Sequence, residues 1–155
     1  MRNVTSLQLL FISLLLLPVV SQAVVTDELI MIRSQQDFPT TMVNLQDAIK
    51  VQGYQVSRVQ RVDVGLSKSG FKTDRYRLVF FGKGSEIEFL RKKYPSLIPY
   101  LPLKIVIFAE GEETLLVTLN PKQLMQMYSE PSLQPIFVRW QQDVINIMRV
   151  VRVAD

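Results

Sequence analysis

The stretch LKIVIFAEGEETLLVTL, residues 103–119, decides the fold. Its first part, Leu103–Phe108, is rich in β-branched residues and predicts a buried strand. Glu110–Glu113 places Gly111 among acidic residues and predicts a tight turn. Leu115–Leu119 is then the returning strand, so the stretch predicts a β-hairpin.

Upstream of this hairpin, the sequence predicts a strand followed by a helix. Glu28–Arg33 is a short apolar run of strand type. Asp37 is a favourable helix cap, and Pro39 suits the first helical turn. Apolar residues then recur with a 3.6-residue period until Gly53, which we expect to end the helix.

A second group of elements lies between that helix and the hairpin. Tyr54–Leu66 alternates apolar and polar residues and predicts a strand, with a bulge near Ser57–Val59 where the alternation changes phase. The residues 67–70 predict a turn. Tyr76–Phe81 predicts a further strand, and Ser85–Tyr94 predicts a helix.

Two helices are expected after the hairpin. Asn120 and Pro121 form the start signal of a short one. Pro135 opens a longer one with a single apolar stripe. The stripe consists of Ile136, Phe137, Trp140, Val144, Ile147, Met148 and Val151.

The resulting order is β-α-β-β-α-β-β-α. It predicts an α+β two-layer sandwich, with a mostly antiparallel or mixed sheet and helices on one face. No internal repeat or linker interrupts the pattern, so we expect one domain over residues 24–155.

The N-terminus has the features of a secretory signal peptide. Arg2 precedes a short apolar run, Leu7–Val20, and Pro18 breaks that run near its end. Small residues at Ser21 and Ala23 suit a signal peptidase. We expect residues 1–23 to be removed after Ala23. The mature protein would then be periplasmic or secreted, and not integral to the membrane.

The composition excludes several chemistries. The chain has no histidine and no cysteine, which rules out Ser-His-Asp and Cys-His catalysis. Zinc sites built from nitrogen and sulfur ligands are also excluded. We expect no metal and no cofactor. A small enzyme that uses carboxylates or lysine alone stays an alternative, and its densest carboxylate group is Glu110, Glu112 and Glu113.

The stretch GKGSEIE, residues 82–88, looks at first like a phosphate loop between a strand and a helix. The P-loop spacing and its Lys-Ser/Thr ending are absent. Ser85 and Glu88 instead have the spacing of a capping box. Glu86 and Glu88 also put negative charge in the first helical turn, which would repel an anion.

Basic residues concentrate in one part of the chain. Between Arg58 and Lys93 there are ten basic and four acidic residues, a net charge of +6. Such asymmetry indicates an anionic ligand or an anionic envelope surface as a partner. A solvated sheet face is the plainer interpretation, and we expect no nucleic-acid partner for an exported protein. The candidate contact residues are Arg58, Arg61, Arg75, Arg77, Lys83, Arg91, Lys92 and Lys93.

Aromatic residues near the last helix are candidates for a protein interface. Tyr128, Phe137 and Trp140 are of the residue types that anchor such surfaces. The alternative interpretation places the stripe of the last helix in the core against the sheet.

Four apolar segments resemble the DUF302 family of bacterial and archaeal domains of unknown function. They are residues 48–54, 76–81, 88–90 and 101–108. This chain departs from the pattern at Gly82–Gly84, where many relatives have Asn-Pro, and at Leu103, where many have cysteine. The resemblance implies a two-layer fold and a homodimer, and it implies no reaction.

These observations favour a non-catalytic binding or assembly module over the carboxylate or lysine enzyme. Peripheral attachment to an anionic envelope surface through residues 58–93 is a third hypothesis.

Overall fold

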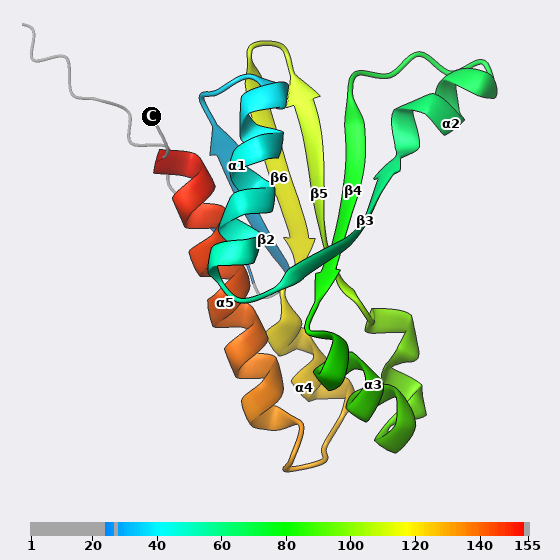
Figure 1. Ribbon diagram of the computed structural model, residues 1–155, viewed down its shortest axis with the longest axis vertical. Coiled ribbons are helices and arrows are strands. Elements are labelled where there is room, and N and C mark those ends of the chain that lie inside the picture. The colour runs from blue at the N-terminus through cyan, green and yellow to red at the C-terminus, as the bar shows by residue number, and fades with distance from the viewer. Residues whose placement is uncertain (1–23, 27, 154–155) are drawn as a thin grey trace, which may run out of the picture.

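The structure, a computed structural model, describes residues 24–26 and 28–153 of the chain. The predicted signal peptide, residues 1–23, lies outside these described residues. The fold is α+β, with one antiparallel sheet and helices packed against it (Figure 1). The strands are β1 (Val24–Val25), β2 (Leu29–Ser34), β3 (Gln55–Arg61), β4 (Tyr76–Gly82), β5 (Leu103–Glu110) and β6 (Glu113–Leu119).

The six strands lie in the order β1-β2-β6-β5-β4-β3, and every neighbouring pair is antiparallel. The predicted hairpin is confirmed as β5 and β6, which pair Val106 with Val117 in the middle of the sheet. Gly111 in its turn has a φ of 62°, a conformation that favours glycine. The hairpin therefore supplies the two central strands.

The helical elements lie in three places. Two long helices lie along one face of the sheet, the short helices α3 and α4 gather at one end of it, and α2 projects at the other end (Figure 1). None of the helices in the described part of the chain is both long and apolar enough to cross a bilayer. The helices are α1 (Phe38–Val51), α2 (Val62–Lys68), α3 (Gly84–Lys93), η1 (Pro95–Tyr100), η2 (Pro121–Gln123), α4 (Leu124–Met127) and α5 (Gln134–Val153).

The main core lies between the sheet and the two long helices, α1 and α5. The side chains that alternate toward these helices are fully buried, and each contributes about 1.5–3 kcal/mol by leaving water. Leu45 and Ile49 come from α1, and Ile147 comes from α5. From the strands come Ile30, Ile32, Val79, Phe81, Ile105, Ile107 and Leu116.

The start and the end of α1 are as predicted. The Asp37 carboxylate accepts a hydrogen bond of 3.0 Å from the Thr40 amide, which satisfies a free N–H of the first turn. Gly53 follows the helix with a φ of 80°, the left-handed conformation expected after a helix end.

A second core forms where α3, η1, η2 and α4 meet the first half of α5. We call this end of the molecule the lower lobe, after its place in Figure 1. Six buried side chains fill it: Leu90, Leu97, Leu124, Leu133, Phe137 and Trp140. The lobe therefore covers the lower end of the sheet.

The predicted strand over Tyr54–Leu66 is correct only as far as Arg61. The bulge is confirmed, because the pairing with β4 shifts between Val56 and Arg58. Beyond Arg61, which pairs with Arg77, β4 provides no further partner residues. The backbone of residues 62–68 must therefore satisfy its own hydrogen bonds, and it does so as α2.

The predicted capping box at Ser85 and Glu88 is wrong. The helix begins one residue earlier, at Gly84, and the flanking Lys83 makes no side-chain cap. Glu88 instead pairs with Lys92 on the helix surface, at 2.8 Å. In the first turn, the Glu86 carboxylate accepts from the side chains of Arg139 and Trp140 and not from a backbone N–H.

Candidate functional site

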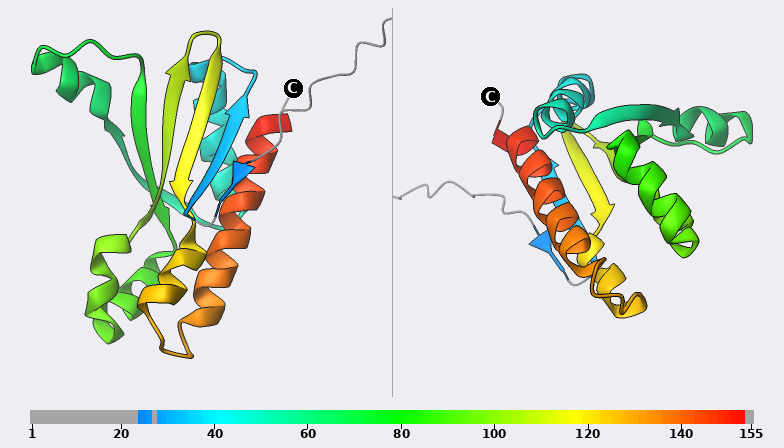
Figure 2. Two further views of the ribbon diagram at one scale, coloured as in Figure 1. Left: turned by 180° about the vertical axis from the view of Figure 1, so that it is seen from behind. Right: turned by 60° about the horizontal axis from the view of Figure 1, so that its bottom comes forward.

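The second face of the sheet is apolar, and none of the helices in the described residues covers it. Because side chains alternate along a strand, the neighbours of the core residues point to the other side. Seen from behind, the molecule presents strands, with α1 beyond them (Figure 2, left). We call this surface the open face. Its apolar residues are Leu29, Met31, Tyr76, Leu78, Phe80, Val106, Phe108, Leu115, Val117 and Leu119.

Cross-strand pairing aligns the open face into rows. One row, the central row, runs from Met31 through Val117 and Val106 to Leu78. The next contains Tyr76 and Phe108, whose rings meet edge-to-face at 5.8 Å. These side chains shield one another only in part. Contiguous apolar surfaces are typical of interaction sites.

The two ends of the open face carry opposite charge. At the β5–β6 turn lie Glu110 and Glu113, which are cross-strand partners. At the other end Lys104 and Arg58 lie on either side of Phe80 in one row. Within residues 24–26 and 28–153, the side chains of Lys104 and Arg58 form no ion pair.

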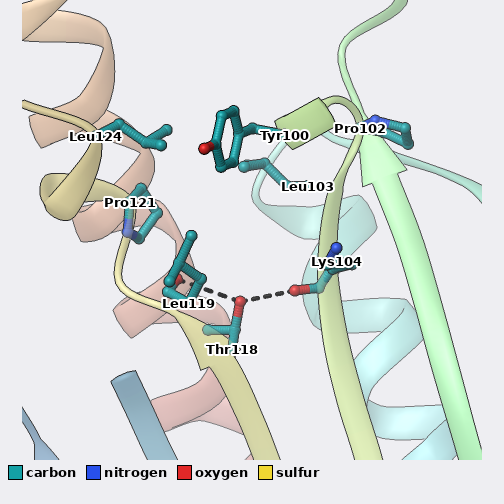
Figure 3. A pocket seen from close by; sticks show the side chains of 8 residues that line it. All are labelled: Tyr100, Pro102, Leu103, Lys104, Thr118, Leu119, Pro121 and Leu124. Carbon is teal, nitrogen blue, oxygen red and sulfur yellow. Dashed lines mark hydrogen bonds between the residues drawn. The ribbon is translucent and has the colours of Figure 1, made fainter. Parts of the chain in front are cut away.

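Beside Lys104, at the lower end of the open face, is a small hollow (Figure 3). Its volume is about 50 Å³, far below the several hundred Å³ of a ligand pocket. The Thr118 hydroxyl donates to the Lys104 carbonyl at 2.7 Å, so it is already satisfied. The hollow suits one apolar side chain. Its lining is Tyr100, Pro102, Leu103, Lys104, Thr118, Leu119, Pro121 and Leu124.

A polar network ties the lower lobe to α5. The Tyr54 hydroxyl donates to Asp143 at 2.6 Å and accepts from Arg139 at 3.2 Å. Arg139 also bonds Glu86, which accepts from the Trp140 indole at 3.0 Å. Burial, aided by the bond to Asp143, raises the pKa of Tyr54 far above its ordinary value. Tyr54 is therefore a fixed donor, and the network positions α3 on α5.

The comparisons with known proteins identify the family. The model of "Domain of unknown function DUF302" matches residues 30–151, nearly all of the described chain. The chain belongs to the DUF302 family. The crystal structure of an uncharacterized conserved DUF302 protein from Bacillus stearothermophilus has a TM-score of 0.72 at 18% identity. The match covers 80% of this chain and 98% of that one, and it shows the fold. No match was found among curated proteins.

The structure divides the predicted basic surface of this DUF302 chain. Arg58 lies on the open face. Arg61, Arg75 and Arg77 lie beside the start of α1, where Phe38 is, on the other side of the sheet. Lys83 stacks on the Tyr54 ring, 4.6 Å from its centroid. Arg91, Lys92 and Lys93 end α3 in the lower lobe. The eight residues therefore do not form one surface.

The predicted aromatic interface is inside the molecule. Phe137 and Trp140 are 0% and 1% exposed, because α3 and η1 pack over that part of α5. Tyr128 is half-buried, and its hydroxyl donates to the Ser96 carbonyl at 2.6 Å. Phe137 and Trp140 thus belong to the core of the DUF302 domain, as the alternative interpretation held, and are not available to a partner.

Sequence reasoning missed the open face, although a signal for it was present. The segments 78–81 and 115–117 are apolar at consecutive positions, so they offer apolar side chains to both faces of the sheet. The predicted helices were expected to pack on only one face of the sheet. Among the described residues of the DUF302 chain, no cluster of carboxylates could hold a metal ion.

Replacing Glu86 tests the network. Glu86→Ala removes the acceptor of both Arg139 and Trp140, so we expect a loss of about 1–3 kcal/mol in the free energy of unfolding. Glu88→Ala is the matched control, because it removes only an exposed pair worth about 0.5 kcal/mol. Urea unfolding measures both. Equal losses would show that the network does not position the lobe.

Proposed function

We propose that this DUF302 chain is a secreted or periplasmic, non-catalytic binding or assembly module that works as a homodimer. The observation that carries the proposal is the open face, a row-ordered apolar surface across four strands. Exposure of this apolar face to water is unfavourable, and a partner that covers the face removes this cost.

The charge at the two ends of the open face supports a second copy as the partner. A two-fold axis between two such faces, running across the strands, reverses the strand direction of the partner. The row of Glu110 and Glu113 in one protomer then lies over the row of Lys104 in the other. The axis would pass between the central row and the row of Phe108, so the most apolar rows face each other.

Export rests on the signal-peptide pattern of residues 1–23 and on the cleavage site at Ala23. We place the module ahead of a carboxylate enzyme because the acidic turn is exposed and partly paired. There Glu110 bonds Arg33, and Glu113 accepts from Gln35 at 3.0 Å.

A charge in the central row tests the use of the open face. Val106→Glu would bury an unpaired carboxylate in the interface, so we expect dimer affinity to fall by about a hundredfold or more. Val43→Glu is the control, because Val43 is 57% exposed on α1. Sedimentation equilibrium should give a monomer for the first and a dimer for the second. A native chain that is monomeric at micromolar concentration would contradict the proposal.

Charge exchange tests the orientation of the two copies. Lys104→Glu should weaken the dimer about tenfold, because two acidic groups then oppose each other. Adding Glu113→Lys should restore the dimer affinity. The acidic and the basic group then swap positions, so opposite charges again face each other in both contacts related by the two-fold axis. Failure of the double variant to recover, with folding intact, would rule out this orientation.

A further inference from the structure

The base of the α2 arm concentrates guanidinium groups on the side of the sheet away from the open face. The arm, residues 62–75, projects from the body of the molecule (Figure 2, right). Arg61 and Arg77 are direct cross-strand partners. Arg75 and Arg77 each lie 5.6 Å from the centroid of the Phe38 ring. Like charges placed opposite each other in a sheet are unfavourable, so an anion beside the cluster would stabilise it.

The carboxylates nearby compensate only part of this charge. Asp63 is bound to Arg77, and both side chains are largely buried, at 14% and 13% exposure. The hydrogen bond from Arg77 lowers the pKa of Asp63, so that carboxylate is ionised and engaged. Asp37 lies close enough to Arg75 to feel its charge, but its carboxylate caps α1.

A hollow opens beside this cluster, between α2 and the returning loop. Its volume is about 390 Å³, and it is open to solvent. Arg75, Lys68 and Ser67 lie along its wall, and no ion pair or hydrogen bond engages their side-chain polar atoms in the described part of the chain. The remaining lining residues are Asp63, Val64 and Thr73.

We propose that this hollow binds a phosphate-class oxyanion, either free phosphate or the phosphate group of a larger molecule. Arg75 supplies a planar fork of donors that matches a tetrahedral oxyanion. Lys68 adds a point charge and Ser67 a hydroxyl donor. The space exceeds one ion, which leaves room for the group that carries the phosphate. Because Asp63 is neutralised by Arg77, it does not oppose the anion.

The basic end of α3 provides a contrast within the same chain. Lys92 pairs with Glu88, and Lys93 lies over the rings of Phe89 and Tyr94, at 5.4 and 5.3 Å. The net charge of this end of α3 is as high as that of the arm, but it is spread along an exposed helix, and Lys92 is engaged in an ion pair.

Titration with inorganic phosphate at constant ionic strength tests the proposal. We expect saturable heat in calorimetry for the native chain. The variant Lys68→Gln/Arg75→Gln should bind about tenfold more weakly or worse. The control Arg91→Gln/Lys92→Gln loses the same charge from α3 and should bind as the native chain does. Both variants keep Asp63 and Arg77, and circular dichroism checks that they fold.

Two further probes distinguish the sources of the oxyanion. Tighter binding of glycerol 3-phosphate than of phosphate would indicate a soluble phosphomonoester. Binding only to vesicles that contain phosphatidic acid, lost in the arm variant alone, would indicate a lipid headgroup. Either result supports the site. Absence of saturable binding to all three probes, or an equal loss in the two variants, would overturn the proposal. Neither outcome depends on the oligomeric state.

Discussion

The sheet has apolar side chains on both faces, and the helices of the described chain cover one of them. This imbalance is the constraint on which the rest of the structure depends. On the covered face, residues such as Leu116 are fully buried against α1 and α5, whereas the adjacent Leu115 points to the open face. Burial of apolar area is the main favourable term in folding and in association. The same alternation along one strand therefore builds a core on one side and leaves an apolar surface on the other.

The lower lobe and the arm lie at opposite ends of the sheet, and they differ in how firmly they are held to the core. The lobe is held by a partly buried network in which Glu86 bonds Arg139 and Trp140, so it continues the core. The packed lobe keeps the small hollow beside Lys104 in place at the end of the open face. The arm has no buried residue in α2 and presents its charge to solvent. A rigid apolar face and an exposed basic arm on the opposite side allow two kinds of contact at once.

Much of the fold follows from local signals in the sequence. The cap at Asp37, the glycine at Gly53 and the hairpin around Gly111 act over a few residues, so their patterns predicted the elements correctly. The strand predicted through Leu66 failed because its end depends on the length of the partner strand, which no local pattern contains. The placement of Trp140 in the core likewise depends on which helix covers it. The scattering of the basic residues could not be predicted, because it depends on the direction in which the arm leaves the sheet.

The most direct measurement is the accessibility of the open face in the cell that makes the protein. Because the chain has no cysteine, a single thiol can report one position. Val117→Cys places it in the central row, and Val43→Cys places it on the exposed surface of α1. A membrane-permeant maleimide should label Val43→Cys quickly and Val117→Cys at least about tenfold more slowly, with equal rates after unfolding. Equal labelling in the folded protein would show that nothing covers the open face and would contradict the account.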